Sequence, residues 1–232
     1  MRLDKMISST GIASRSQISS AVRSGRVTVD GVVARKADMQ VDPDAVRVVY
    51  CGTPACYRKF TYIMLNKPEG YVSATEDGRL PTVIELLPEE LQKIGLFPCG
   101  RLDKNTLGLM LLTNDGDTSH RLLAPKSHVA KTYAFRVKFP LSEADIDALE
   151  SGVDIGGYIT APCTVVLDGE REGKITLTEG KYHQIKLMME AVHNQITYLE
   201  RVSFGPLTLD PALDRGQWRY LDDREIALLQ KK

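Results

Sequence analysis

The 232-residue sequence predicts an α+β fold. It comprises a small N-terminal α/β module and a larger domain built on a mixed or antiparallel sheet with flanking helices. Runs of β-branched and alternating apolar residues outnumber the helical patterns. These runs do not alternate strictly with helices, as the strands of a parallel sheet would. A content of 43% hydrophobic and 26% charged residues is typical of a folded globular protein.

The first module, residues 1–50, is expected to contain two short helices and a hairpin. Apolar residues at helical spacing in RLDKMISST predict a helix that Gly11 ends. A second helix begins at Ser14, where Gln17 three residues later can complete a capping box. The following VTVDGVV alternates apolar residues around Asp30–Gly31, which is a strong hairpin signal.

The rest of the chain is expected to form a linker and the larger domain. Residues 51–60 contain Gly and Pro without periodicity, which is typical of a linker, and residues 61–232 follow as the larger domain. Its predicted strands are YIMLN, HVAKTYAFRVKF, APCTVVLD, GKITLT, QITYLERVSF and LTL. Helical patterns are expected at about 81–93, 116–124, 142–151, 183–192 and 222–230. Ser142 and Asp222 can cap two of these helices.

Positive charge is concentrated near the N-terminus, although 30 Lys and Arg balance 30 Asp and Glu overall. Residues 1–50 hold eight basic and five acidic residues, a net charge of +3. A small basic module joined to a larger domain indicates a unit that binds a polyanion. The plainer alternative is a solvated basic helix face. The residues expected to contact a phosphate backbone are Arg2, Lys5, Arg15, Arg23 and Arg26.

Several classes of function lack support in the sequence. Four scattered cysteines fit a reducing cytoplasm rather than a disulfide scaffold, and we expect a cytoplasmic protein. No apolar run reaches the roughly 18 residues of a membrane span, and the N-terminus lacks a secretory signal. Glycine-rich dinucleotide loops, Walker loops and His-Glu-x-x-His are all missing. The four histidines have no metal-ligand spacing, so no metal or cofactor is expected.

The segment most suggestive of chemistry is FPCGRLDKNTLGLMLLTNDG, residues 97–116. A polar turn containing Asp103 precedes an apolar run, so its carboxylate is expected at the mouth of the sheet, flanked by the cations Arg101 and Lys104. An aspartate in a turn is more often structural, because turns favour its local hydrogen bonds. Two other segments weaken that alternative. KTY at 131–133 can place a phenol ring beside the pocket, and EGKYHQIK at 179–186 runs from a turn into a helix.

Together these segments resemble the pseudouridine synthases of the RsuA type and their close relatives that act on large-subunit rRNA. LNKPEG, GRLDKNTLGLMLLTNDG, KTY and EGKYHQIK are similar to successive family motifs over nearly the whole chain. The N-terminal segment is similar to the RNA-binding domain of ribosomal protein S4. The chain length favours the RsuA branch. Leu187 is a departure, because relatives often have a second basic residue at this position.

The resemblance implies a role for each residue of the candidate site. Asp103 is the implied catalytic carboxylate, and Lys186 pairs with it. Tyr133 is implied to stack on the target base, and Arg101 to hold the flipped nucleotide's backbone or fill the space it leaves. The implied reaction detaches uracil from its ribose, turns it and reattaches it through carbon, with no cofactor or metal. Whether Asp103 attacks covalently or removes a sugar proton stays open.

We therefore expect an enzyme that isomerises a specific uridine to pseudouridine. Its expected partner is 16S rRNA or a 30S assembly intermediate, and it is expected to act as a monomer without membrane contact. One alternative is a large-subunit 23S rRNA enzyme of the same family. Another is a non-catalytic RNA-binding factor in ribosome assembly, which would not require Asp103. A DNA-binding helix-turn-helix protein with a sensor domain is less favoured, because the Asp-Gly hairpin directly follows the second helix.

Overall fold

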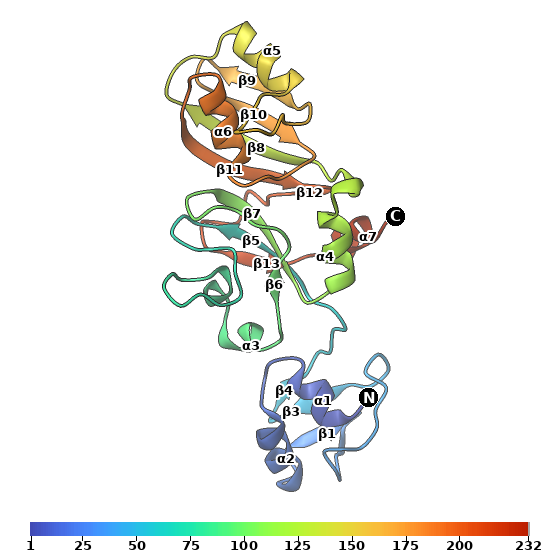
Figure 1. Cartoon of the computed structure of the whole chain (residues 1–232). Coiled ribbons are helices and arrows are strands. Elements are labelled where there is room, and N and C mark those ends of the chain that lie inside the picture. The colour runs from blue at the N-terminus through green and yellow to red at the C-terminus, as the bar shows by residue number, and fades with distance from the viewer. Residues whose placement is uncertain (232) are drawn as a thin grey trace. The chain divides into compact units, whose positions relative to one another are not determined.

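The computed structural model describes residues 1–231, and these form two compact units (Figure 1). The small unit comprises Met1–Thr61 and Leu87–Leu96. The large unit comprises Tyr62–Leu86 and the chain from Phe97 onward. Among the described residues, every helix is too short or too polar to cross a bilayer.

The small unit packs two N-terminal helices against a small antiparallel sheet and also contains the short helix α3 (Glu89–Gln92). The N-terminal helices are α1 (Leu3–Ser8) and α2 (Arg15–Arg23). The sheet has the order β2-β1-β3-β4, and its strands are β1 (Val27–Val29), β2 (Val32–Val33), β3 (Val48–Tyr50) and β4 (Thr53–Pro54). Its apolar core contains residues from both helices and from the sheet, among them Leu3, Ile7, Ile18 and Val27.

The local signals in this unit give the expected elements. Ser14 caps α2, its backbone N–H donates to the Gln17 Oε1 at 2.8 Å, and the capping box is complete. Asp30 and Gly31 have positive φ values of 50° and 81°, as the tight hairpin between β1 and β2 requires. Part of the expected linker is ordered in the sheet, because β4 pairs with β3.

The large unit is built on a mixed sheet, which confirms the predicted α+β class. The strand order is β13-β5-β7-β11-β8-β10-β9, with β6 paired to β7 and β12 paired to β11. Strands β7 and β11 are parallel, and the other neighbours are antiparallel. The strands are β5 (Tyr62–Lys67), β6 (Phe97–Pro98), β7 (Leu107–Thr113), β8 (Lys131–Val137), β9 (Thr164–Gly169), β10 (Glu172–Leu177), β11 (Ile196–Phe204), β12 (Leu207–Thr208) and β13 (Trp218–Tyr220).

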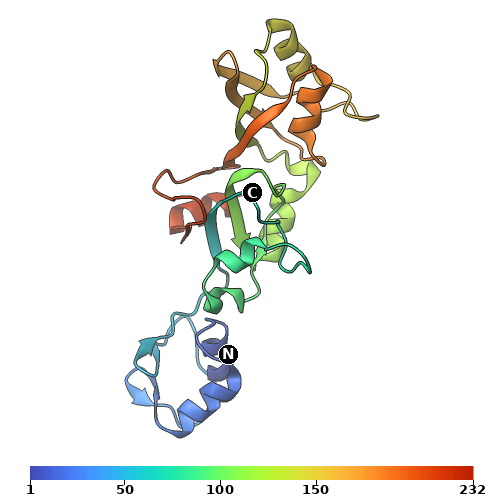
Figure 2. The same ribbon diagram turned by 90° about the vertical axis from the view of Figure 1, so that its left-hand side faces the viewer.

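Most of the predicted helices of this region form, with one interrupted. They are α4 (Gly116–Leu123), α5 (Glu143–Ser151), α6 (Gln184–Ala191) and α7 (Asp223–Gln230). Figures 1 and 2 show these helices as coiled ribbons beside the sheet. Ser142 and Asp222 cap α5 and α7, as predicted. The helix expected over 81–93 is instead a 3-10 turn, η1 (Val83–Leu86), and a short α3 (Glu89–Gln92). Pro88 separates them, because proline lacks the N–H that a continuous helix needs.

Strands β7 and β11 approach each other unusually closely at Gly108. This residue pairs with Arg201 and has a φ of +95°. A Cβ atom at Gly108 would lie 2.4 Å from the Arg201 carbonyl oxygen. Glycine is therefore required here by both backbone conformation and space. The close approach fixes the start of β7, and with it the turn that precedes this strand, against the centre of the sheet.

Candidate active site

The turn that carries Asp103 lies between β6 and β7 and is fastened by a buried lysine. Lys67 ends β5, and its Nζ donates to the carbonyl oxygens of Pro68, Lys104 and Thr106 at 3.0, 3.1 and 2.9 Å. Two of these carbonyls belong to the Asp103 turn. The side chain of Lys67 is fully buried, so the lysine acts as a clamp inside the turn rather than as a surface charge.

Burial lowers the pKa of Lys67 from 10.5 to about 8, because the charged ammonium is removed from water. The carboxylates of Asp103 and Glu69 oppose this change, whereas Arg201 and Lys186 add to it. The ammonium thus lies in the electrostatic field of the candidate site. It contributes positive charge beneath the Asp103 turn without touching the aspartate itself.

Three further hydrogen bonds, from two residues of the loop that follows β5, hold the turn. The Ser73 hydroxyl donates to the Leu102 carbonyl at 2.8 Å and accepts from the Leu102 N–H at 2.9 Å. The Gly70 N–H donates to the Lys104 carbonyl at 3.0 Å. The residues on both sides of Asp103 are therefore tied by backbone contacts to the loop after β5. Two residues of the LNKPEG segment, Lys67 and Gly70, therefore help to position this turn.

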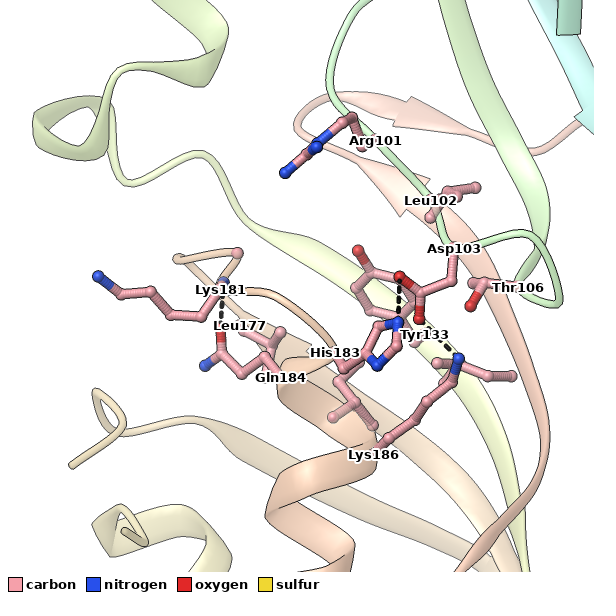
Figure 3. A pocket seen from close by; sticks show the side chains of 13 residues that line it. Arg101, Leu102, Asp103, Thr106, Tyr133, Leu177, Lys181, His183, Gln184 and Lys186 are labelled. Carbon is pink, nitrogen blue, oxygen red and sulfur yellow. Dashed lines mark hydrogen bonds and ion pairs between the residues drawn. The ribbon is translucent and has the colours of Figure 1, made fainter. Parts of the chain in front are cut away.

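The Asp103 carboxylate meets two nitrogen groups from the start of α6 (Figure 3). Lys186 Nζ lies 2.6 Å from Asp103 Oδ2, and His183 Nε2 lies 3.5 Å from Asp103 Oδ1. Each carboxylate oxygen thus faces a different partner. The Asp103 side chain is about one quarter exposed, so it is held in place while remaining open to the pocket.

A hydrogen-bond network around Glu179 shapes the approach to α6. The Glu179 carboxylate accepts from the Tyr158 hydroxyl at 2.7 Å, the Ala161 N–H at 2.9 Å and Gln184 Nε2. His183 then adopts a left-handed backbone conformation, with φ 50°, immediately before the helix. This turn directs the His183 imidazole towards Asp103, while the first turn of α6 brings Lys186 to the same carboxylate.

The four predicted active-site residues all line one pocket, of about 80 Å³. Asp103, Tyr133 and Lys186 lie around its centre, whereas the Arg101 guanidinium extends away from the carboxylate (Figure 3). Tyr133 comes from β8 and is 8% exposed, so its ring forms part of a fixed wall. A larger cavity of about 930 Å³ shares Asp103, Arg101 and Tyr133 with this pocket. That volume lies within the range of ligand-binding sites.

The five basic residues predicted to contact RNA are all exposed on the small unit. Arg2 differs from the others, because its guanidinium donates to the buried Asp4 carboxylate at 2.8 and 3.0 Å. This ion pair lowers the pKa of Asp4 and offsets the charge that Arg2 can offer to a ligand. The four remaining predicted residues, Lys5, Arg15, Arg23 and Arg26, are exposed as well.

Sequence reasoning missed three residues that build the site. Lys67, Ser73 and His183 all act through contacts between segments far apart in the chain. A lysine two residues after the apolar run YIML is one available signal, since the strand YIMLNK is buried along its whole length and leaves such a residue inside. Within residues 1–231, no group of three or more His, Cys, Asp or Glu side chains is arranged to hold a metal ion.

Comparison with protein families places this geometry in a known class. Residues 61–191, more than half of the chain, match the RNA pseudouridylate synthase family. Residues 1–46 match the S4 domain. The chain therefore belongs to the RNA pseudouridylate synthase family.

Individual relatives cover essentially the whole chain. YtzG of Bacillus subtilis (strain 168), an RNA pseudouridine synthase by name, is 47% identical over 100% of this chain and 99% of its own. Ribosomal small subunit pseudouridine synthase A of Escherichia coli (strain K12) is 38% identical over 98% of this chain and 99% of its own. A crystal structure described as a pseudouridylate synthase is similar with a TM-score of 0.70 and 32% identity, covering 99% of both chains. These matches extend over both units of the chain.

Proposed function

We propose that this protein isomerises a specific uridine of 16S ribosomal RNA to pseudouridine. The main support for catalysis is the Asp103 carboxylate, paired with Lys186 at 2.6 Å in a pocket walled by Tyr133. Small-subunit rRNA is favoured because the Escherichia coli relative is named for the small ribosomal subunit and covers both units of this chain. The substrate is 16S rRNA itself or a 30S assembly intermediate. The enzyme acts as a monomer in the cytoplasm, where that RNA is found.

The proposed reaction moves one bond of the nucleotide. The bond between N1 of uracil and C1′ of ribose breaks, the base turns, and a bond forms between C5 and C1′. C5 loses its proton and N1 gains one, so the product has the same atoms as the substrate. Asp103 takes part either as a nucleophile at the sugar or as the base that removes a sugar proton. Both routes need a carboxylate that is held in place and accessible.

The other site residues prepare this carboxylate and the base. Lys186 holds Asp103 in its orientation, because its ammonium donates directly to Oδ2. Tyr133 offers a flat surface for the uracil ring. Arg101, which is exposed and lines both the pocket and the cavity, holds the backbone of the extruded nucleotide or fills the space it leaves. Extruding a stacked base costs a few kcal/mol, which contacts to the phosphates can offset.

The decisive experiment maps pseudouridine in bacterial rRNA after incubation with the purified protein. Chemical labelling of pseudouridine followed by primer extension identifies the modified nucleotide. We expect one modified site in 16S rRNA with the wild-type protein and none with Asp103→Asn. The variant replaces one carboxylate oxygen with an amide of similar size, so it should retain its fold and RNA binding. Full turnover by Asp103→Asn would overturn the catalytic assignment, and modification confined to 23S rRNA would overturn the proposed substrate.

A further inference from the structure

Two cations lie on the sheet face next to Tyr133, at the base of the larger cavity. Arg201 of β11 pairs directly with Tyr133 of β8, and Lys131 lies two residues before Tyr133 on the same strand. Directly paired residues, and residues two apart on a strand, project from the same face of a sheet. All three side chains line the cavity that also contains Asp103. The two cations therefore share one surface with the candidate catalytic pocket.

The two cations also contact one aromatic ring. The Lys131 Nζ lies 5.9 Å, and the Arg201 guanidinium carbon 5.1 Å, from the centre of the Phe204 ring. Phe204 itself is buried. A ring flanked by two cations holds them near each other and gives each a modest attraction. The ring cannot neutralise two charges, however, so the local excess of positive charge remains.

The polar partners of these cations are all uncharged. Arg201 is 2% exposed, and its Nε donates to the Leu109 carbonyl at 2.8 Å. One of its terminal nitrogens lies 3.9 Å from the Met110 sulfur. Lys131 Nζ donates to the Val129 carbonyl at 3.0 Å. Within the described chain, neither cation forms an ion pair with a carboxylate.

The neighbouring thiol does not supply a negative charge either. Cys99 lies close enough to interact electrostatically with both Lys131 and Arg201, but burial raises the pKa of this thiol and keeps it neutral. Burial, with the nearby Arg201, lowers the pKa of Lys131. A buried charge normally has a partner of opposite sign, because removing it from water is costly. A buried arginine and a half-buried lysine without such a partner, both lining one cavity, fit an anionic ligand.

We propose that Lys131 and Arg201 form a subsite for a backbone phosphate of the RNA, adjacent to the uridine that reaches Tyr133 and Asp103. The inference rests on the proposed function, which supplies RNA as the ligand. A guanidinium and an ammonium that line one cavity beside the same ring suit a phosphodiester, because they can donate to its unbridged oxygens. The phosphate would neutralise the pair only when the nucleotide enters, so the subsite favours the extruded nucleotide over the stacked one.

The test removes the charge from each side of the contact in turn. Short RNAs containing the mapped uridine are prepared with one neutral methylphosphonate linkage at each position around it. Protein variants are Lys131→Met, which removes the charge, and Lys131→Arg, which restores it. Lys138→Met is the matched control, because Lys138 is an exposed lysine just beyond the other end of β8. Melting followed through Trp218 fluorescence establishes that each variant is folded.

One linkage should identify the subsite. At that linkage, we expect the neutral substitution to lower kcat/KM of the wild type about tenfold, as loss of a charged hydrogen bond does. On native RNA, the kcat/KM of Lys131→Met should likewise be about tenfold below that of the wild type. On the substituted RNA, the kcat/KM of Lys131→Met should be almost the same as on native RNA. Lys131→Arg should recover most of the loss, and Lys138→Met should behave as wild type.

Two results would overturn the subsite while leaving the proposed function intact. One is a wild-type enzyme that forms pseudouridine but tolerates every neutral linkage. The other is a Lys131→Met variant in which the fold-loss of kcat/KM multiplies with the fold-loss caused by each neutral linkage. Independent effects of this kind in a double-mutant cycle mean that Lys131 and the phosphate are not in direct contact. If Lys131→Met does not fold, the Lys131→Arg variant and the linkage scan of the wild type still decide the outcome. Failure of the wild type to modify any rRNA would instead overturn the proposed function.

Discussion

Lysines occupy three different electrostatic positions around the Asp103 turn. Lys186 contacts the carboxylate directly at 2.6 Å. Lys67 lies behind the turn and holds its carbonyls, and Lys131 lies across the cavity without a charged partner. The same side chain therefore serves as ion-pair partner, structural clamp and candidate anion ligand. Burial and geometry determine the role, because each position has a different cost for its charge.

The clamp at Lys67 predicts an unusual dependence of stability on pH. Below about pH 8 this lysine is charged in both the folded and the unfolded protein. Between about 8 and 10.5 the folded protein has released the proton while the unfolded chain still binds it, so stability rises with pH. The free energy of unfolding of the wild type minus that of Lys67→Met should increase by about 2 kcal/mol between pH 7.5 and pH 9.5.

Urea unfolding at the two pH values measures this difference. The single tryptophan, Trp218, reports on the large unit, because β13 pairs with β5 at Leu65, two residues before Lys67. Lys174→Met serves as the control, since the Lys174 side chain is about half exposed and its pairing with Asp168 is loose, at 3.9 Å. If the difference in free energy of unfolding between the wild type and Lys67→Met stays constant with pH, the expected change in protonation is contradicted.

At the scale of elements, local sequence patterns predicted the helices and strands whose formation needs no distant partner. The capping boxes at Ser14, Ser142 and Asp222 gave the starts of three helices, because both members of each box lie within one turn. Strand β13 was not predicted, and its three residues form a strand because they pair with β5. Such short segments have little periodicity of their own, so the partner determines their conformation.

The parallel contact between β7 and β11 predicts an element-level effect of one substitution. Gly108→Ala places a methyl group against the Arg201 carbonyl and strains a backbone with φ +95°. The strands must separate, and we expect a loss of about 3 kcal/mol or more of stability. The comparison is Gly116→Ala, at the start of α4, where the added methyl group meets open space. It should be neutral or slightly stabilising.

Thermal unfolding of the two glycine variants tests this prediction. The expected result is a melting temperature several degrees lower for Gly108→Ala and an unchanged or higher value for Gly116→Ala. Because Gly108 follows the Asp103 turn directly, its substitution should also reduce pseudouridine formation. Equal melting temperatures for the two variants would show that β7 and β11 can separate at no cost.

At the scale of the whole molecule, the sequence named candidate site residues but not the contacts that bring them together. Asp103, Arg101, Tyr133 and Lys186 line one pocket, and their roles stay predictions. The contacts that assemble it, such as Lys67 to the Thr106 carbonyl, join residues tens of positions apart. Pattern and charge in a single sequence do not encode such pairings. They depend on the order of strands in the sheet, which local signals leave open.

The small unit predicts how RNA binding by the full chain responds to salt. Arg15, Arg23 and Arg26 are exposed on and beside α2. If each contacts a phosphate, the triple Arg→Gln variant should reduce the slope of log affinity against log salt by about 2 to 3, at roughly 0.7 to 0.9 for each contact. Pseudouridine formation at saturating RNA should change little, because the site residues belong to the large unit.

Binding to 16S rRNA at several salt concentrations measures this slope. A matched variant replaces three exposed cations of the large unit, Arg171, Lys174 and Arg224, with glutamine. None of these three lines the site pocket or the larger cavity. We expect the matched variant to keep the wild-type slope. An unchanged slope for the Arg15, Arg23 and Arg26 variant would mean that α2 does not face the RNA.

The position of β11 also governs when the enzyme can become functional during its own synthesis. The chain makes β5 and β7 early and β8 to β10 later, yet β11, at Ile196–Phe204, is the strand that joins the two groups. A nascent chain that has not yet emerged past residue 204 holds Asp103 and Tyr133 on separate halves. Late, long-range pairing of this kind is slow to form. Modification of RNA therefore waits until the chain has emerged past residue 204.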